Sequence, residues 1–276
     1  MRNRRAPAAL ALSLLATAGG CAMFTNEAVV RSTDSLLLPP VQAAPEAVQL
    51  ELVYVERPVS DPLLGRSMWN ELDQMAGIPH ETRLNLGENG FRVAMCGSQP
   101  PPQLAELLKA GMRQEYDDPA GFWTNRRIVM RDGATTDVMC SHEPAAWDVD
   151  VVRGGVPEPK RYESALGFLR VDVSSVQDGW VEVQVCPEVR FGAAKLRHEA
   201  AETGWRLKDG QNVEAVPGAA FRVHMNLNEM LVLSAADGVA KRVGNRFFRR
   251  DDDGRLMQRV VVLRAAAVPR TKAVSH

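Results

Sequence analysis

From about residue 113 onward, the chain alternates apolar and polar residues in short runs separated by turn-forming residues. Alternation with a period of two places apolar side chains on one face of a strand, and Asp-Gly or Asn-containing pairs are typical of hairpin turns. The pattern predicts an antiparallel sandwich or meander over residues 113–268, with a single helix around residues 193–202. Its four hairpin turns are expected at Asp132-Gly133, Asp178-Gly179, Asn228-Glu229 and residues 251–254.

Residues 47–112 predict a smaller module that mixes strands with helices. Residues 48–55 form a β-branched run, and Asp61-Pro62 is a typical helix start before apolar residues spaced three or four apart. A hairpin is expected around residues 87–90, and a second helix over residues 102–110. The expected fold class is therefore α+β: a small strand-helix-hairpin-helix module followed by a mostly antiparallel β domain.

The start of the chain is typical of an export signal. Arg2, Arg4 and Arg5 precede an apolar stretch over residues 8–18, and Ala18-Gly19-Gly20 lead into Cys21. A basic start, an apolar stretch of about 7–15 residues and small residues at the cleavage site indicate a secretory signal peptide over residues 1–20. The apolar stretch is shorter than the roughly 20 residues that a bilayer-spanning helix needs.

Small residues followed directly by Cys21 resemble the lipobox of bacterial lipoproteins. This resemblance implies that Cys21 becomes the lipidated first residue of the mature protein, with ordinary cleavage near Ala22 as the alternative. Each buried acyl methylene stabilises membrane attachment by about 0.8 kcal/mol. By the same resemblance, Ala22 after the cysteine implies the periplasmic face of the outer membrane. Residues 21–46, with Pro39-Pro40 and little periodicity, predict a tether, and residues 269–276 a tail.

The charge balance argues against a nucleic-acid partner. The whole chain carries a net charge of −1, and residues 1–20 hold three arginines and no acidic residue. Phosphate backbones are bound by clustered Lys and Arg side chains. The basic residues between 241 and 250 are followed at once by three aspartates, which indicates a solvated hairpin end rather than a polyanion site.

Three cysteines remain if Cys21 is lipidated. In an oxidising compartment, Cys96, Cys140 and Cys186 allow one disulfide and a leftover thiol, or no disulfide, and Cys96–Cys140 is the candidate bridge. His142 close to Cys140 has the residue types of a zinc ligand set or a nucleophile. No second Cys/His pair at useful spacing accompanies it, so we predict an exposed histidine at a strand end. We predict no catalytic residue, metal or cofactor.

Residues 180–264 resemble the C-terminal domain of secretins. Residues 181–189 match a strand that ends in a Pro-Glu-Val-like stretch, and residues 221–233 match a later hairpin with a polar turn. Residues 260–263 match a closing apolar strand. Ser234-Ala235-Ala236 stand where secretins usually have paired glycines. The resemblance implies a degenerate, secretin-like component of an envelope assembly, in which edge strands pair between copies.

These patterns predict an exported cell-envelope lipoprotein with a structural or protein-binding role. Its partners would be the membrane, through the lipid anchor, and other envelope proteins; the oligomeric state stays open. Besides the secretin-like component, one alternative is an exported hydrolase that uses carboxylates of the β domain. Another is a small-ligand binding protein in which the tryptophans line a cleft: Trp69, Trp123, Trp147, Trp180 and Trp205.

Overall fold

The computed structural model describes residues 47–117, 122–177, 179–201, 204–238 and 240–269. The predicted signal peptide, Cys21, the tether and all of the tail after Pro269 lie outside the described residues. Every described residue belongs to the unit formed by residues 42–276.

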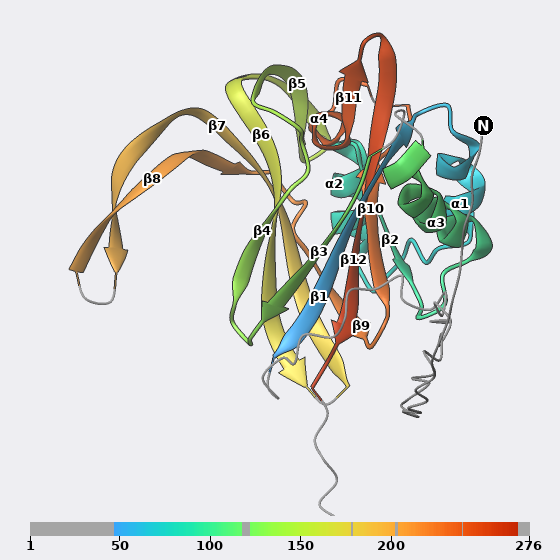
Figure 1. The fold of residues 1–276 in the computed structure, drawn as a ribbon. Coiled ribbons are helices and arrows are strands. Elements are labelled where there is room, and N and C mark those ends of the chain that lie inside the picture. The colour runs from blue at the N-terminus through green and yellow to red at the C-terminus, as the bar shows by residue number, and fades with distance from the viewer. Residues whose placement is uncertain (1–46, 118–121, 178, 202–203, 239, 270–276) are drawn as a thin grey trace, which may run out of the picture. The chain divides into compact units, whose positions relative to one another are not determined.

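Antiparallel β-sheet dominates these residues, as the sequence predicts (Figure 1). A first sheet has the strand order β2-β10-β12-β1-β3, with β11 paired to β12. Its strands are β1 (Val48–Pro58), β2 (Phe91–Cys96), β3 (Phe122–Met130), β10 (Met230–Ala235), β11 (Arg249–Asp252) and β12 (Arg255–Ala267). β1 and β12 pair from Gln49–Ala267 to Pro58–Met257, so the beginning and the end of the fold lie together in this sheet.

A second sheet has the order β4-β6-β7-β8, with β5 paired to β6 and β9 paired to β7. Its strands are β4 (Thr135–Met139), β5 (Ala145–Arg153), β6 (Val156–Gln177), β7 (Trp180–Ala201), β8 (Gly204–Ala215) and β9 (Phe221–Asn226). The pairing of β7 with β8 changes register between Phe191 and Lys195. Beyond that point the two strands leave the sandwich as a projecting arm (Figure 1).

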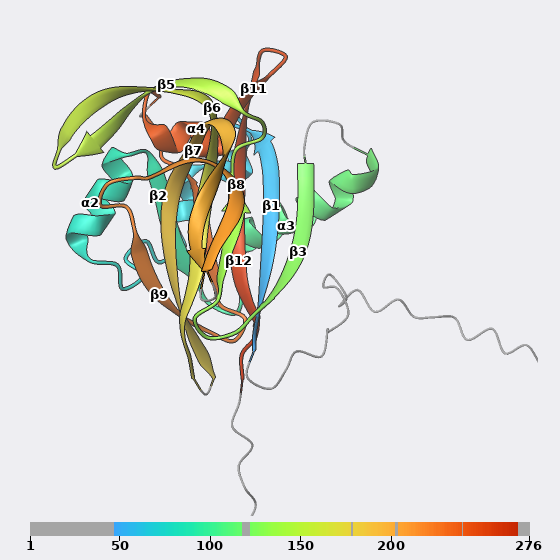
Figure 2. The same cartoon turned by 90° about the vertical axis from the view of Figure 1, so that its left-hand side faces the viewer.

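η1 (Pro62–Leu64), α1 (Arg66–Asn70) and α3 (Pro102–Asp117) cover the face of the first sheet that points away from the second sheet (Figures 1 and 2). α2 (His80–Glu88) and α4 (Val243–Phe248) instead add Leu86, Phe247 and Phe248 to the core between the two sheets. Asp61 begins η1 as the sequence predicts, because its Oδ1 accepts a hydrogen bond from the Leu63 N–H at 2.9 Å. No helix among the described residues is long and apolar enough to cross a lipid bilayer.

The first sheet carries an apolar core on each of its faces. Along β1, Leu50 and Leu52 pack into the core between the two sheets, whereas Val53 and Val55 pack into the core beneath η1, α1 and α3. Successive strand residues point to opposite faces, so a strand buried on both sides has few polar positions. Each fully buried side chain of this kind stabilises the fold by roughly 1.5–3 kcal/mol.

Two of the four predicted hairpins are confirmed and two are wrong. β6 and β7 form a hairpin, and so do β11 and β12. β3 and β4 lie in different sheets although they flank Asp132-Gly133, and β9 and β10 lie in different sheets although they flank Asn228-Glu229. At both turns the chain crosses from one sheet to the other. Positive φ angles of 73° at Gly133 and 67° at Asn228 serve these crossings as they would serve a hairpin.

The predicted hairpin around residues 87–90 is also wrong. Residues 83–86 belong to α2, and Gly90, with a φ of 84°, follows the end of that helix and leads into β2. The observed order is thus one strand, three short helices (η1, α1 and α2), a second strand and α3. β1 pairs with β12 and β3, and β2 pairs with β10, so strands of residues 47–112 and 113–268 share one sheet.

The helix predicted around residues 193–202 is a strand, because β7 continues to Ala201 in its pairing with β8. Phe247 and Phe248, which precede the turn at residues 251–254, lie in α4, where both are buried. The predicted helix over residues 102–110 is confirmed, and it continues to Asp117.

A close backbone approach joins α4 to the turn after α2. The Gly244 N–H donates to the Asn89 carbonyl oxygen at 2.8 Å. A Cβ atom on Gly244 would lie 2.4 Å from the carbonyl carbon and oxygen of Gly90. The buried Asn89 side chain exchanges two hydrogen bonds with the Val152 backbone, at 3.0 and 2.8 Å, and so ties the same turn to β5.

We predict that Gly244→Ala lowers the free energy of unfolding by roughly 2 kcal/mol or more, because the added methyl group has to displace backbone. Gly87→Ala is the matched control: nothing lies within 4 Å of its Cβ position inside α2, so it should raise stability by about 0.5–1 kcal/mol. Urea unfolding followed by tryptophan fluorescence measures both. Equal stabilities of the two variants would contradict the close approach.

Candidate functional site

A buried charged cluster lies where β1, β11 and β12 meet the loop after β4. The Glu56 carboxylate is its centre, with the side chain 1% exposed. Its Oε1 accepts from Arg250 Nε at 2.5 Å, and its Oε2 lies 3.2 Å from Arg259 Nη2 and 3.0 Å from His142 Nε2. Arg259 also donates to the Cys140 carbonyl oxygen at 2.7 Å, so the cluster links the two sheets.

This cluster keeps Glu56 ionised at neutral pH. Burial alone would raise the pKa of Glu56, but hydrogen bonds with His142 and Arg250, together with the charge of Arg259, lower that pKa to about 2. A general base works best when its pKa lies near the working pH. At neutral pH, Glu56 is thus a poor proton acceptor, and we assign it a structural role.

Cys140 and His142, which lie close together in the sequence, both contact the cluster around Glu56: Cys140 through its carbonyl oxygen and His142 through its side chain. They do not form a reactive pair. The Cys140 thiol is fully buried and donates to the Val138 carbonyl oxygen at 3.6 Å. Burial raises its pKa to about 12, and the thiolate is the nucleophilic form of cysteine. His142 lies in the loop after β4, which ends at Met139, and its side chain is part-buried against Glu56 and Arg259, so the prediction of an exposed histidine is wrong. Nothing in the sequence links residue 56 to residue 142.

The bridge predicted between Cys96 and Cys140 is not formed. Cys96, Cys140 and Cys186 are free and buried in the structure. Cys96 belongs to the core beneath the helices, whereas Cys140 belongs to the core between the sheets. Because these cores lie on opposite faces of the first sheet, the two thiols cannot reach disulfide geometry without moving that sheet.

Metal and carboxylate chemistry finds little support in the described residues. No group of three or more His, Cys, Asp or Glu side chains there could hold a metal ion. On the outer face of the second sheet, Arg170 binds Glu188 at 2.6 Å and Arg190 binds Asp137 at 2.5 Å. Glu188 is buried beneath these two arginines and Asp137 is exposed, and each carboxylate is paired with arginine, which is not the setting of an acid–base pair.

The predicted tryptophan-lined cleft is not seen where the side chains are described. Trp69 and Trp147 are 1% and 2% exposed and pack in the two cores. Trp180 packs against His224 with ring centroids 5.0 Å apart. The side chains of Trp123 and Trp205 lie outside the described part of the structure.

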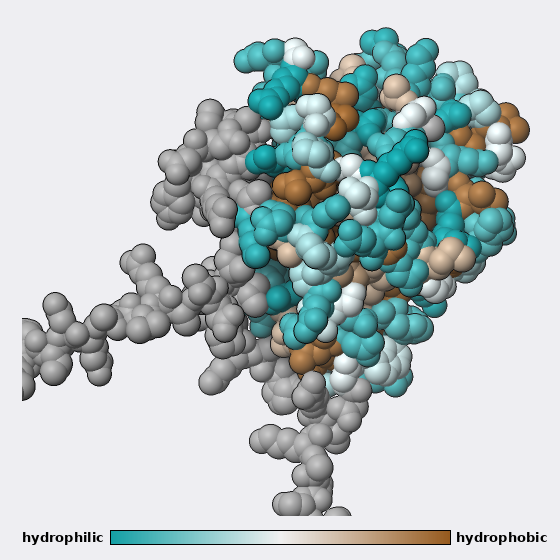
Figure 3. All heavy atoms as spheres, turned by 90° about the vertical axis from the view of Figure 1, so that its right-hand side faces the viewer, coloured by the Kyte–Doolittle hydropathy of each residue, from teal (hydrophilic) through white to brown (hydrophobic). Residues whose placement is uncertain are grey.

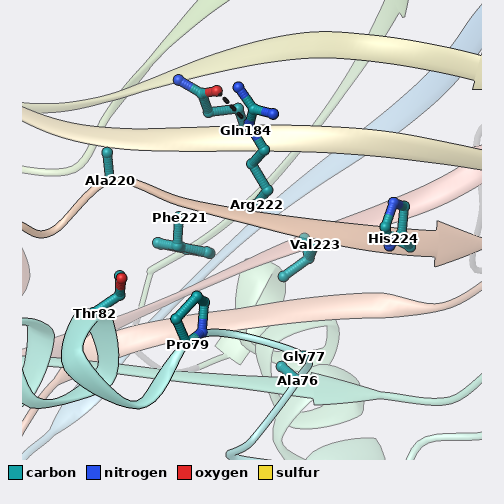
Figure 4. A pocket seen from close by; sticks show the side chains of 10 residues that line it. All are labelled: Ala76, Gly77, Pro79, Thr82, Gln184, Ala220, Phe221, Arg222, Val223 and His224. Atoms are coloured by element: carbon teal, nitrogen blue, oxygen red, sulfur yellow. Dashed lines mark hydrogen bonds between the residues drawn. The ribbon is translucent and has the colours of Figure 1, made fainter.

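A groove runs along β9, at the side of the second sheet (Figure 4). Its volume is about 410 Å³, within the range of small-ligand and peptide sites. One wall is β9, and the other is formed by Ala76 and Pro79, which lead into α2, and by Thr82 in the first turn of α2. Phe221 and Val223 point from β9 toward Pro79 (Figure 4). We name this site the β9 groove.

Polar side chains form the outer rim of the β9 groove. Arg222 Nε donates to Gln184 Oε1 at 2.8 Å, and His224 Nε2 lies 2.8 Å from Glu182 Oε2. Arg222 and His224 are both well exposed, at 64% and 66% of their side chains. An apolar floor with a few polar groups at the rim is typical of a binding site.

The side that carries α1 and α3 has a different character (Figure 3). Hydrophilic side chains dominate that view, and its hydrophobic patches are separated from one another. Large continuous apolar patches are the usual mark of a protein-binding face. The β9 groove is therefore the stronger candidate among the described residues.

Sequence reasoning missed the β9 groove. The alternation of residues 221–226 predicts a strand with Arg222 and His224 outward, and the structure confirms that pattern. The pattern does not say which strand lies beside β9, nor that α2 approaches its other side. The neighbours of β9 follow from the turn at Asn228, where the chain passes from the second sheet to the first.

We predict that Glu56→Gln lowers the free energy of unfolding by about 3 kcal/mol at pH 7, because it leaves the buried Arg259 and the part-buried Arg250 without this counter-charge. The wild-type contribution is fully present above pH 4.5, the ordinary pKa, and is lost as the pH falls toward 2. Urea unfolding from pH 7 to pH 2 should show a shallower acid loss in the variant. Glu163→Gln, at an exposed ion pair, is the control and should change stability by less than about 0.5 kcal/mol.

We further predict that all three buried cysteines are reduced in the mature protein. Alkylation in denaturant without reductant, followed by peptide mass analysis, should label Cys96, Cys140 and Cys186. Under native conditions Cys140 should react slowest, because its thiol is buried and its pKa is raised. A peptide that joins Cys96 to Cys140 would contradict the structure.

No family model, curated protein or solved structure matches this chain. We therefore base its function on the sequence signal and on the geometry of the β9 groove.

Proposed function

We propose that this protein is an exported cell-envelope lipoprotein whose folded body binds another envelope protein. The signal-like residues 1–20 and the lipobox-like approach to Cys21 support export and anchoring. The anchor would hold the body at a membrane, with the periplasmic face of the outer membrane as the expected site. The proposal assigns no catalytic activity.

The β9 groove is the observation that carries the binding role. It combines an apolar floor, a polar rim and a size suited to a short stretch of a partner chain. Cys140 and Glu56 do not line the β9 groove. Cys140 is a buried thiol with a raised pKa, and Glu56 is an ion-paired carboxylate with a lowered pKa. This arrangement favours recognition over catalysis.

The secretin-like alternative loses one of its supports. The resemblance of residues 221–233 depends on a hairpin, and in the structure β9 pairs with β7 while β10 pairs with β2 and β12. We therefore propose a binding partner for the groove rather than a ring of identical copies.

We predict that Cys21→Ser moves the protein from the membrane fraction to the soluble fraction of the envelope. The reason is that acyl chains supply the membrane attachment. The mass of the N-terminal peptide from wild-type membranes should equal a peptide beginning at Cys21 with its lipid. An unmodified Cys21 in that peptide would overturn the lipoprotein assignment.

We predict that a photo-crosslinking residue at position 82 captures an envelope protein in living cells. Thr82 lies in the wall of the β9 groove, whereas position 163, on the exposed face of β6, serves as the matched control. The adduct should form at position 82 and not at position 163, as judged by gel shift and mass spectrometry. Absence of any adduct at position 82 would count against the binding role.

A further inference from the structure

His142 lies between a cation and an anion, and its two contacts decide which ring nitrogen carries a hydrogen. Its Nδ1 lies 2.8 Å from Arg259 Nη2, and its Nε2 lies 3.0 Å from Glu56 Oε2. A guanidinium group has donors and no acceptor, so Nδ1 accepts a hydrogen bond from Arg259. Nε2 therefore carries the hydrogen and donates it to the Glu56 carboxylate. These contacts assign His142 to the neutral Nε2–H tautomer.

A second proton cannot bind His142 while the contact with Arg259 lasts. Nδ1 is the remaining basic atom of the neutral ring, and its lone pair is used by Arg259 Nη2. A proton at Nδ1 would set two N–H donors, each on a cation, against each other. Like charges in contact disfavour the charged form of either group. Protonation of His142 therefore requires that its bond with Arg259 break.

Glu56 offers little compensation for a protonated His142, because its carboxylate is already shared. Arg250 Nε lies 2.5 Å from Oε1, and Arg259 Nη2 lies 3.2 Å from Oε2, the oxygen that also faces His142. Protonation of His142 would thus place a third positive charge around one buried carboxylate. Asp252, which pairs with Arg250, is exposed and lies on the hairpin of β11 and β12. A buried charge without a counter-ion of its own destabilises the folded state.

The other groups that face His142 keep their charge over the range in which a histidine ordinarily titrates, about pH 5 to 8. Against the effect of burial, hydrogen bonds with basic side chains lower the pKa of Glu56 to about 2. Burial raises the pKa of Cys140 to about 12, and it also raises the pKa of Tyr54, two residues before Glu56 on β1. The arginines stay protonated throughout. Glu143, the next residue in the loop, is exposed.

His142 belongs to the loop after β4, residues 140–144, which contacts both sheets. The start of the loop is fixed to β6, because the Cys140 N–H donates to the Gly167 carbonyl oxygen at 2.9 Å. The Cys140 carbonyl oxygen accepts from Arg259 Nη1 at 2.7 Å. Beyond these fixed points, the side chain of His142 joins the loop to β1 and β12. Loss of that contact frees the rest of the loop while its start stays in place.

We propose that the loop after β4 is released from the first sheet when His142 takes up a second proton, as the pH falls from 8 to 5. The contact is complete at pH 8, where the ring is neutral, and it is lost in the protonated form. Arg259 keeps its bonds with Glu56 and the Cys140 carbonyl, so the body stays folded while one end of the sandwich loosens. This acid-sensitive device uses no residue of the β9 groove and does not rest on the proposed binding role.

Nuclear magnetic resonance of the isotope-labelled full-length protein in mild detergent tests the release. At pH 8 the ring of His142 should show a protonated Nε2 and an unprotonated Nδ1, and at pH 5 both nitrogens should be protonated. The backbone order parameters of His142 and Glu143 should fall over the same range from about 0.85 to below about 0.6. An Nδ1–H tautomer at pH 8, a ring that stays neutral at pH 5 or unchanged order parameters would each overturn the proposal.

A variant that cannot titrate gives a second, independent readout. Between pH 8 and pH 5, the thermal unfolding midpoint of the wild type should fall about 3 °C further than that of His142→Gln, because glutamine takes up no proton in this range. His224→Gln is the matched control: His224 also contacts a carboxylate, that of Glu182, but it is exposed, so this variant should keep the wild-type pH dependence. Equal pH dependence of the wild type and His142→Gln contradicts the release. Should His142→Gln not fold, as judged by circular dichroism, the wild-type order parameters alone decide.

Discussion

The pairing of β1 with β12 is the interaction on which the rest of the structure depends. These two strands lie in the middle of the first sheet; β1 is buried almost along its whole length, and β12 is buried from Met257 to Leu263. Their two faces support different layers, the helices on one side and the second sheet on the other. The helical layer and the second sheet therefore both pack against this central pair of strands.

The buried charges follow from the same pairing. Glu56 stands opposite Arg259 in the register of β1 and β12, at the end of the sandwich where the core meets the loop after β4. An isolated carboxylate there would be costly, but three neighbouring basic side chains hold it as an anion. The cluster connects the loop after β4 to β1 and β12 of the first sheet, because Arg259 and Glu56 contact Cys140 and His142. We therefore assign the cluster a structural role.

The sequence predicts the kinds of elements better than their neighbours. Period-two alternation identified the strands around Val183 and Val261, and turn chemistry identified the bends at Gly133 and Asn228. A turn residue specifies a local change of direction, and the same φ angle serves a hairpin or a crossing between sheets. The partners of β4, β9 and β10 depend on packing across the whole chain. That dependence is why the β9 groove and the contact of His142 with Glu56 could not be predicted.

The pairing of β1 with β12 also has a consequence for the order of events during biogenesis. Gln49 pairs with Ala267, more than 200 positions later, so the centre of the first sheet cannot close before nearly the whole chain is available. Contacts of such long sequence separation slow folding and leave strand edges exposed meanwhile. A chain whose central strand pair closes last cannot complete its first sheet until the residues near Ala267 have been synthesised. Under the export that we propose, this topology would favour a chain that is still unfolded when translocation begins.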